Sequence, residues 1–332
     1  METREQKSWI ASPILVAGTC LFLTLFGSCA RDQTAPPETE PIPAPGDIWV
    51  LTTLPFNGTV QDILTVGEST VFVGTWGGGL FRSADSGKTW SRIAADITDD
   101  VLCLAGTSDG AFLFGMENGM FRSEDGGDTW INVLQSSGGI PEDIFATPAG
   151  EVVAGVFYGG IYYSSDNGIS WIRLSTKLDD RLLCVVISKL GYFFAGTNSG
   201  MLRSTDHGAS WDSVDGLSGV RYLAVNPNGI LFASTASGVH RSTDEGITWT
   251  IGDGLGPSPV SLVTGNDGTL FAGTSGQGVF MSIDEGTTWI PLQGGLDETS
   301  VRSIAVTHEG YVYVGTWLAG LFKSRFPIRV RD

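Results

Sequence analysis

Several charged side chains of this 332-residue chain could carry out acid–base chemistry. Carboxylates stand in pairs at Glu142-Asp143 and Asp179-Asp180, and Asp62 follows Gln61 in a similar apolar run. Two carboxylates about 5–10 Å apart can hydrolyse a glycosidic bond, one as the acid and the other as the base or nucleophile. The other members of this polar group are Arg181, Arg221, Tyr222, Glu298 and Arg302. If the chain is a hydrolase, we expect its site to be built from these residues.

The sequence shows no residue pattern typical of metal, cofactor or nucleic-acid binding. His207, His240 and His308 are the three histidines, and they fall in different repeats without the spacing of metal ligands, so we predict no metal site. A phosphate-binding loop, a nucleophile elbow and a Cys/His pair are all missing from the sequence, so we expect no cofactor. With 19 basic against 36 acidic residues, the net charge of −17 argues against nucleic acid as a partner.

Six further aspartates belong to an eight-residue pattern, called the box below, that recurs every 38–41 residues. Every copy has Ser, Asp, Gly and Trp at its first, third, fifth and eighth positions. Asp accepts hydrogen bonds from nearby backbone N–H groups and Gly supplies a positive φ, so the box predicts a turn between two strands. We therefore interpret these aspartates as structural; they are Asp85, Asp125, Asp166, Asp206, Asp244 and Asp284.

Short apolar runs precede every box at similar spacing. One set reads VFVGT at residues 71–75, FFAGT at 193–197 and VYVGT at 312–316, and such β-branched and aromatic runs favour strands. Each repeat then holds four short strands, with the box between the third and the fourth. Four-stranded units repeated around an axis form a β-propeller. The predicted fold class is all-β, a propeller of four-stranded antiparallel blades.

The box resembles the Asp-box (BNR) repeat of sialidases, sortilin-type receptors and photosystem II stability/assembly factor-like proteins. The resemblance covers about residues 46–324. It implies that the boxes lie on the propeller face away from the binding site. Arg181, Arg221 and Arg302 with Tyr222 match in type the arginine triad and tyrosine of sialidases, but the Arg-Ile-Pro element of those enzymes is absent near the domain start.

The chain ends indicate seven blades and a closed ring. The seventh unit stops at Ser324 without a box, while Trp49 precedes Trp90 by one repeat length. We therefore predict that the strand around Trp49 completes the last blade and removes a free sheet edge. The predicted domains are a signal segment at 1–29, a Pro-rich linker at 30–46, the propeller at 47–325 and a C-terminal tail at 326–332.

Aromatic residues interrupt the repeat at the turns between the second and third strands. The binding residues that we predict, on the face opposite the boxes, are Trp76, Phe157, Tyr158, Trp317, Arg221, Tyr222 and Arg302. Ring closure makes the first and seventh blades neighbours, so Trp76 and Trp317 should lie close together. Tryptophan is enriched among residues that dominate interfaces. The alternative is that the two rings pack between blades.

The N-terminus predicts export. Arg4 and Lys7 precede an apolar run over residues 9–28, as in a secretory signal. The Gly-Ser-Cys that ends at Cys29 resembles a bacterial lipobox, which implies lipidation of Cys29, and Ala30 after it resembles an outer-membrane sorting signal. A transmembrane anchor or simple secretion are the alternatives. The five prolines of residues 30–46 favour a semi-rigid tether.

From these features we predict an exported, lipid-anchored, monomeric and non-enzymatic module for binding or assembly. We expect it to bind a protein or glycan at the cell envelope through the face opposite the boxes. The alternative is an exo-acting glycoside hydrolase of sialidase type.

Overall fold

The computed structural model describes residues 48–94, 97, 99–135, 139–175, 181–256, 259–292, 294–296 and 299–328. These residues belong to one compact unit, Thr39–Asp332. The predicted signal segment with Cys29, the predicted linker, Asp179, Asp180 and Glu298 lie outside the described residues.

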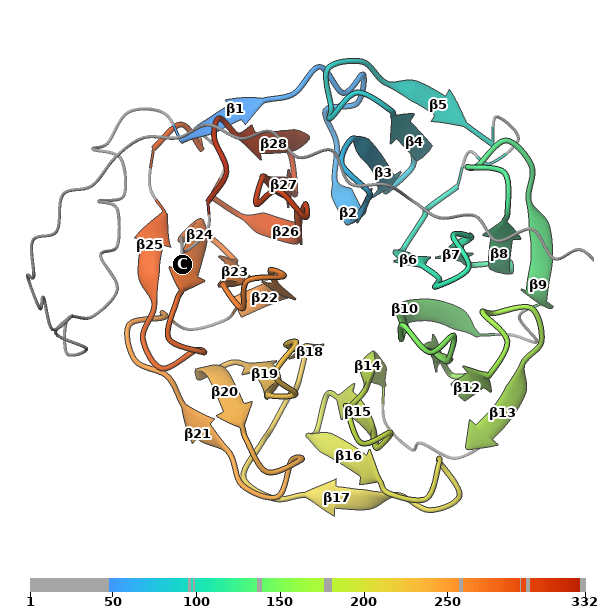
Figure 1. The fold of residues 1–332 in the computed structure, drawn as a ribbon, viewed down its shortest axis with the longest axis vertical. Helices are drawn as coiled ribbons and strands as arrows, with labels where there is room; N and C mark the ends of the chain where they lie inside the picture. The colour runs from blue at the N-terminus through green and yellow to red at the C-terminus, as the bar shows by residue number, and fades with distance from the viewer. Residues whose placement is uncertain are drawn as a thin grey trace, which may run out of the picture. The chain divides into compact units, whose positions relative to one another are not determined.

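Seven four-stranded antiparallel sheets, and no helix, make up the described part of the chain. They are arranged around one axis as the blades of a propeller (Figure 1). The predicted fold class and number of blades are thereby confirmed. Blades are numbered 1 to 7 in chain order below. No described residue lies in a helix long and apolar enough to cross a bilayer.

Each blade runs from the axis outward in the order of its strands. The first strands, next to the axis, are β2 (Val60–Val66), β6 (Cys103–Gly106), β10 (Ile140–Ala146), β14 (Leu182–Ile187), β18 (Tyr222–Val225), β22 (Pro259–Thr264) and β26 (Val301–Val306). The second strands are β3 (Thr70–Thr75), β7 (Phe112–Met116), β11 (Val152–Phe157), β15 (Phe193–Thr197), β19 (Leu231–Thr235), β23 (Leu270–Thr274) and β27 (Val312–Thr316).

The third strands end at the first residue of a box, except in blade 7. They are β4 (Gly79–Ser83), β8 (Gly119–Ser123), β12 (Gly160–Ser164), β16 (Met201–Ser204), β20 (Gly238–Ser242), β24 (Val279–Ser282) and β28 (Leu321–Ser324). The outermost fourth strands are β5 (Ser91–Ile93), β9 (Ile131–Gln135), β13 (Ile172–Ser175), β17 (Asp212–Val214), β21 (Thr250–Ile251), β25 (Ile290–Leu292) and, from the other end of the chain, β1 (Trp49–Leu51).

Strand β1 closes the ring. It pairs antiparallel with β28, with Trp49 opposite Ser324, and so forms the fourth strand of blade 7. The Trp49 side chain is 1% exposed, and its Nε1–H donates to the Leu292 carbonyl of blade 6 at 3.3 Å. The predicted closure is therefore confirmed. Beyond β28, Ile328 is also buried and its N–H donates to the Gly310 carbonyl, so residues 326–328 pack onto blade 7.

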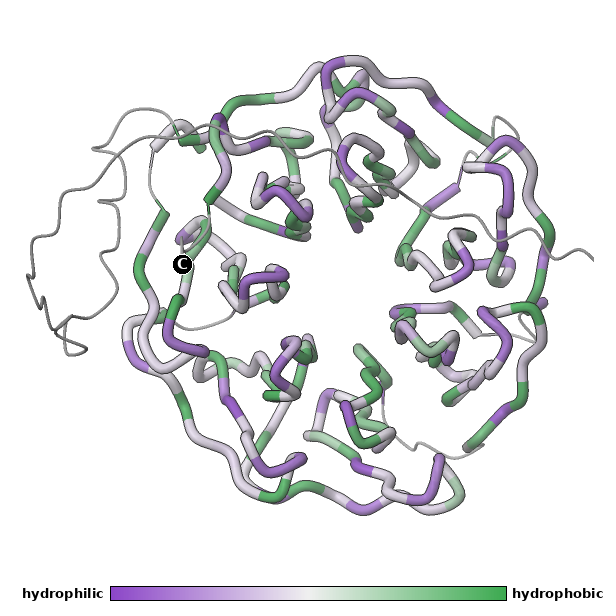
Figure 2. Tube along the Cα trace, in the orientation of Figure 1, coloured by the Kyte–Doolittle hydropathy of each residue, from purple (hydrophilic) through white to green (hydrophobic). Residues whose placement is uncertain are grey.

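The core is divided into seven clusters, each between two neighbouring blades. The cluster between blades 1 and 2 is typical: Phe72 and Leu80 of blade 1 meet Phe114 of blade 2, and Trp130 packs against them. Hydrophobic stretches occur in every blade for this reason (Figure 2). Since every blade buries its surface only against its two neighbours, stability depends on an unbroken ring.

Candidate binding face

The two ends of the propeller carry different sets of turns. Backbone hydrogen bonds join boxes to the turns between first and second strands, as from the Ser86 N–H to the Ser69 carbonyl and from the Asn167 N–H to the Gly150 carbonyl. Boxes therefore share one end of the ring, which we call the box face. In antiparallel blades, the turns between second and third strands lie at the other end, which we call the loop face.

Each box is closed by one repeated set of hydrogen bonds. In blade 4, the Ser204 hydroxyl donates to Asp206 Oδ1 and accepts from the Gly208 N–H, both at 2.8 Å. Asp206 also accepts from the Ser210 N–H at 2.8 Å and from the Ser210 hydroxyl at 2.6 Å. Because this hydroxyl and N–H stabilise the carboxylate, the pKa of Asp206 falls to about 2. The same four bonds occur in the other boxes.

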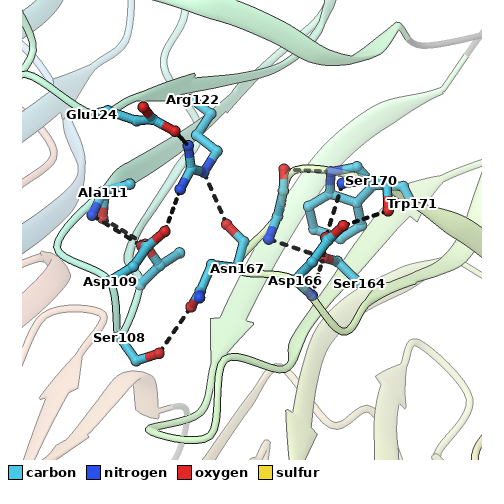
Figure 3. Close-up of polar contacts among 12 residues, drawn as sticks. Ser108, Asp109, Ala111, Arg122, Glu124, Ser164, Asp166, Asn167, Ser170 and Trp171 are labelled. Atoms are coloured by element: carbon cyan, nitrogen blue, oxygen red, sulfur yellow. Dashed lines mark hydrogen bonds and ion pairs between the residues drawn. The ribbon is translucent and has the colours of Figure 1, made fainter.

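A cation near the end of the third strand joins several blades to the next one. Arg122 of blade 2 is 5% exposed, and its Nε–H donates to the Asn167 carbonyl in the box of blade 3 at 3.0 Å (Figure 3). Its other nitrogens pair with Asp109 and Glu124. Lys323 of blade 7 similarly donates to the Ser86 carbonyl of blade 1 at 2.9 Å. The box face is thus held by bonds within and between blades.

On the loop face, the backbones of Trp76 in blade 1 and Trp317 in blade 7 both form hydrogen bonds with Thr59. The Thr59 carbonyl accepts from the Trp76 N–H at 3.0 Å, and the Thr59 hydroxyl donates to the Trp317 carbonyl at 2.7 Å. Trp76 is 56% exposed and Trp317 40% exposed. Two large rings are thus available to a partner at the seam of blades 7 and 1.

Arg302 supports this seam from the axis side. It occupies a β-bulge of β26, since Val301 and Ser303 pair with consecutive residues of β27. Its guanidinium lies 5.4 Å from the Trp317 ring centre, and its Nε–H donates to Gln61 Oε1 at 2.7 Å. Its Nη1 donates to Tyr222 Oη of blade 5 at 3.2 Å. Desolvation raises the pKa of Tyr222 to about 12, which disfavours a nucleophilic role because the phenolate is hard to form.

A second aromatic group lies at the seam of blades 3 and 4. The rings of Phe157 and Tyr158 stack with centres 3.9 Å apart, and the Arg181 guanidinium lies 4.8 Å from the Phe157 ring centre. Arg181 also donates to Glu142 Oε1 at 2.8 Å. Tyr158 is 84% exposed and has a φ of +58°. A bulky residue in this left-handed region is an outlier.

The carboxylates nearest the axis are engaged in linking blades. Asp62 accepts from the Leu104 N–H of blade 2 at 2.7 Å and from the Ile63 N–H at 2.8 Å. Asp143 accepts from the Val185 N–H of blade 4 at 2.8 Å. Desolvation raises the pKa of Asp62 to about 6 and that of Asp143 to about 7, against the opposing effect of these bonds. Their geometry is that of inter-blade links.

The predicted site residues thus fall into two groups. Trp76, Trp317, Arg302 and Tyr222 come together at blades 7, 1 and 5, whereas Phe157 and Tyr158 lie at blade 3. Arg181 bonds to Glu142 rather than joining Arg302, and Arg221 is exposed immediately before β18.

Sequence reasoning missed the linking role of Thr59 and the 75% exposed Leu318 beside Trp317. The strain at Tyr158 left a signal in the sequence, because Gly77 and Gly276 occupy the same turn position in blades 1 and 6. No group of His, Cys, Asp and Glu side chains suited to a metal ion occurs within the described ranges.

Comparison with known proteins places the fold. No family model matches the chain. No curated protein matches it either. Among solved structures, YCF48 bound to D1 peptide matches with a TM-score of 0.67 and 18% identity, over 87% of this chain and 100% of that one. The WD40 propeller domain of Doa1 matches with a TM-score of 0.66 and 14% identity, over 81% of this chain and 94% of that one.

A glycoside hydrolase is also similar in fold. The GH74 xyloglucanase from Xanthomonas campestris matches with a TM-score of 0.64 and 15% identity, over 84% of this chain and 53% of the enzyme. This chain therefore spans about half of that enzyme. At these identities the likeness establishes the propeller fold alone, because one fold hosts many functions.

Proposed function

We propose that this chain is a non-enzymatic binding or assembly module that holds a protein partner on its loop face. The observation that carries the proposal is Tyr158, a highly exposed ring on a strained turn. A left-handed conformation costs a non-glycine residue roughly 1–2 kcal/mol. Blades 1 and 6 avoid that cost with Gly77 and Gly276. A positive φ also occurs in the boxes, at Ser86, Asn167, His207, Glu245 and Glu285, where it belongs to the repeated framework turn. Tyr158 differs because its φ of +58° presents an 84% exposed aromatic ring outside that turn, and strain outside the framework is one mark of a functional site.

The residues around Tyr158 and the tryptophan pair support contact with protein. Tyr and Trp supply large rigid contact surfaces and are enriched at interface positions whose truncation weakens binding most. The solved structure of YCF48 contains a bound D1 peptide, so a propeller of similar fold does hold a peptide. The resemblance of the boxes to Asp-boxes also favours the loop face, since in those families the binding site lies away from the boxes.

The hydrolase alternative depends on Asp62 and Asp143. Their raised pKa values are of the kind seen in general acids. Both carboxylates nevertheless accept backbone hydrogen bonds from the next blade, and this already accounts for their presence. We therefore favour binding over glycoside hydrolysis.

We further propose that the module is exported and lipidated at Cys29. The motif at residues 27–29 and the Pro-rich stretch that follows support this proposal from the sequence. A tether of that kind holds a domain away from a membrane while its loop face stays accessible. The partner would then be a protein of the cell envelope. Metabolic labelling with a lipid analogue tests this, and label retained by Cys29→Ser would contradict it.

Site-specific crosslinking tests the proposed face. A photoreactive amino acid at position 158 or 76 should crosslink one envelope protein, whereas the same group at Ile247 of the box face should not. Ile247 is a matched control because it is 70% exposed and lies in a box. Equal crosslinking from both faces would contradict the proposal. Turnover of a fluorogenic glycoside panel that Asp143→Asn abolishes would favour the hydrolase.

A further inference from the structure

The two aromatic groups of the loop face share one construction. In each, an arginine lies over the first aromatic residue of a loop-face turn, Trp317 or Phe157. In each, that arginine also donates to a polar side chain at the bulge position of a first strand. The acceptors are Gln61 at 2.7 Å and Glu142 at 2.8 Å, and both stand where the pairing register shifts. We call the groups subsite 1 (Trp76, Trp317, Arg302, Gln61) and subsite 2 (Phe157, Tyr158, Arg181, Glu142).

The subsites lie on nearly opposite sides of the ring axis. Subsite 1 spans the seam of blades 7 and 1, and subsite 2 the seam of blades 3 and 4 (Figure 1). The remaining loop-face turns carry small or polar residues: Glu117-Asn118, Asn198-Ser199, Ala236-Ser237 and Ser275-Gly276. Among the described turns between second and third strands, large rings are therefore confined to two places.

The arginines of the subsites serve to orient the rings. Arg302 is fixed by Gln61 and Tyr222, and the charge of Arg181 is balanced by Glu142. The whole chain carries a net charge of −17, so its field disfavours an anionic partner. The most exposed side chains of the subsites are the rings of Tyr158 and Trp76, which suit apolar and aromatic side chains, and Arg181 is 46% exposed beside them.

We propose that the partner on the loop face is an extended, neutral or basic polypeptide segment that crosses the ring axis. It places one apolar or aromatic side chain on each subsite. This inference rests on the proposed protein-binding function and specifies the form of the partner. Once one side chain is bound, the second binds at the effective concentration set by the linking residues. Affinity then depends on spacing, because each extended residue adds about 3.3–3.6 Å.

Designed peptides test this inference on the full-length chain in mild detergent. The probes are fluorescein-labelled Gly/Ser/Thr peptides with two Phe residues separated by a spacer that is varied from two to twelve residues, and a matched peptide with one Phe. We expect one spacer length to bind at least about tenfold tighter than the single-Phe peptide, which corresponds to about 1.4 kcal/mol. Trp76→Ala and Tyr158→Gly should each remove that advantage, and the box-face control Ile247→Ser should not. Two Lys in the spacer should preserve binding, whereas two Glu should weaken it.

The outcomes separate this inference from the proposed function. Affinity that does not depend on spacing would overturn the crossing segment, and so would tighter binding of the Glu peptide than of the Lys peptide. If the single-Phe peptide binds as tightly as any other and only Trp76→Ala weakens it, the loop face still binds protein but the inference fails. Crosslinking from positions 76 and 158 judges the proposed function independently of these peptides.

Discussion

The box face and the loop face are built from one repeat and have opposite properties. On the box face, the same four hydrogen bonds recur from blade to blade, and residues such as Arg122 and Lys323 extend them to the next blade. On the loop face, the turns differ among blades and leave Trp76, Tyr158 and Leu318 largely exposed. Hydrogen-bonded backbone groups identify a framework. Exposed apolar residues of the box face, such as Ile169 and Ile247, stand in separate boxes, whereas the exposed rings of the loop face are grouped, and grouped apolar surface marks a place for a partner. The predictions below test this division.

The largest expected effect is on the free energy of unfolding, and it distinguishes Trp49 from Trp76. Trp49→Ala should lower the free energy of unfolding by about 3–5 kcal/mol, because it empties a fully buried site and weakens ring closure. Trp76→Ala should change it by about 0.5 kcal/mol or less, because that ring is mostly exposed. Chemical denaturation of both variants measures the difference. Similar losses would mean that Trp76 is inter-blade packing.

A box hydroxyl should matter less than Trp49 but more than any loop-face residue. Ser204→Ala should lower the free energy of unfolding by about 1–3 kcal/mol, because the buried Gly208 N–H loses its acceptor. Ser213→Ala, on the exposed outer strand of the same blade, is the matched control and should have little effect. The denaturation midpoint is the readout. An unchanged midpoint for Ser204→Ala would show that the box hydrogen bonds add little to stability.

The pH dependence of stability separates the boxes from the carboxylates at the axis. Asp62 and Asp143 have raised pKa values, about 6 and about 7, so the folded chain holds more protons than the unfolded chain between pH 3.8 and about 7. Their contribution is complete below pH 3.8 and is lost progressively as the pH rises from about 4 to 7. The positive charge of Arg302 lowers the pKa of Asp62 and so opposes the effect of burial. The negative charges of Asp62 and Glu142 raise the pKa of Asp143 further.

The box aspartates should affect stability at lower pH than Asp62 and Asp143 do, and with the opposite sign. The pKa of Asp85 and of Asp206 is lowered to about 2, so their contribution is present above pH 3.8 and is lost as the pH falls toward 2. Melting temperatures between pH 2 and 8 should therefore pass through a maximum. Asp143→Asn should flatten only the decline between about pH 4 and 7. A variant that flattened both limbs would contradict the assignment.

The repeat predicts the framework well because each invariant box position has a structural task. Asp206 serves N–H groups, Gly208 takes a positive φ, and Trp211 fills an inter-blade cluster. The closeness of Trp76 and Trp317 followed from ring closure. The links through Thr59 and Glu142 could not be predicted, because they depend on bulges and connections whose lengths differ among blades. These are also the places where a repeat protein gains individual function.

The most direct test of the division between faces compares Tyr158→Gly with Ser204→Ala. For each variant, both the melting temperature and the affinity for the crosslinked envelope partner are measured. Tyr158→Gly should leave the melting temperature unchanged or slightly raised, because it relieves the strained turn, and should weaken binding about tenfold or more. Ser204→Ala should lower the melting temperature and leave the affinity of the folded protein unchanged. If Tyr158→Gly destabilises the ring without weakening binding, the loop face is not the binding surface and the account is wrong.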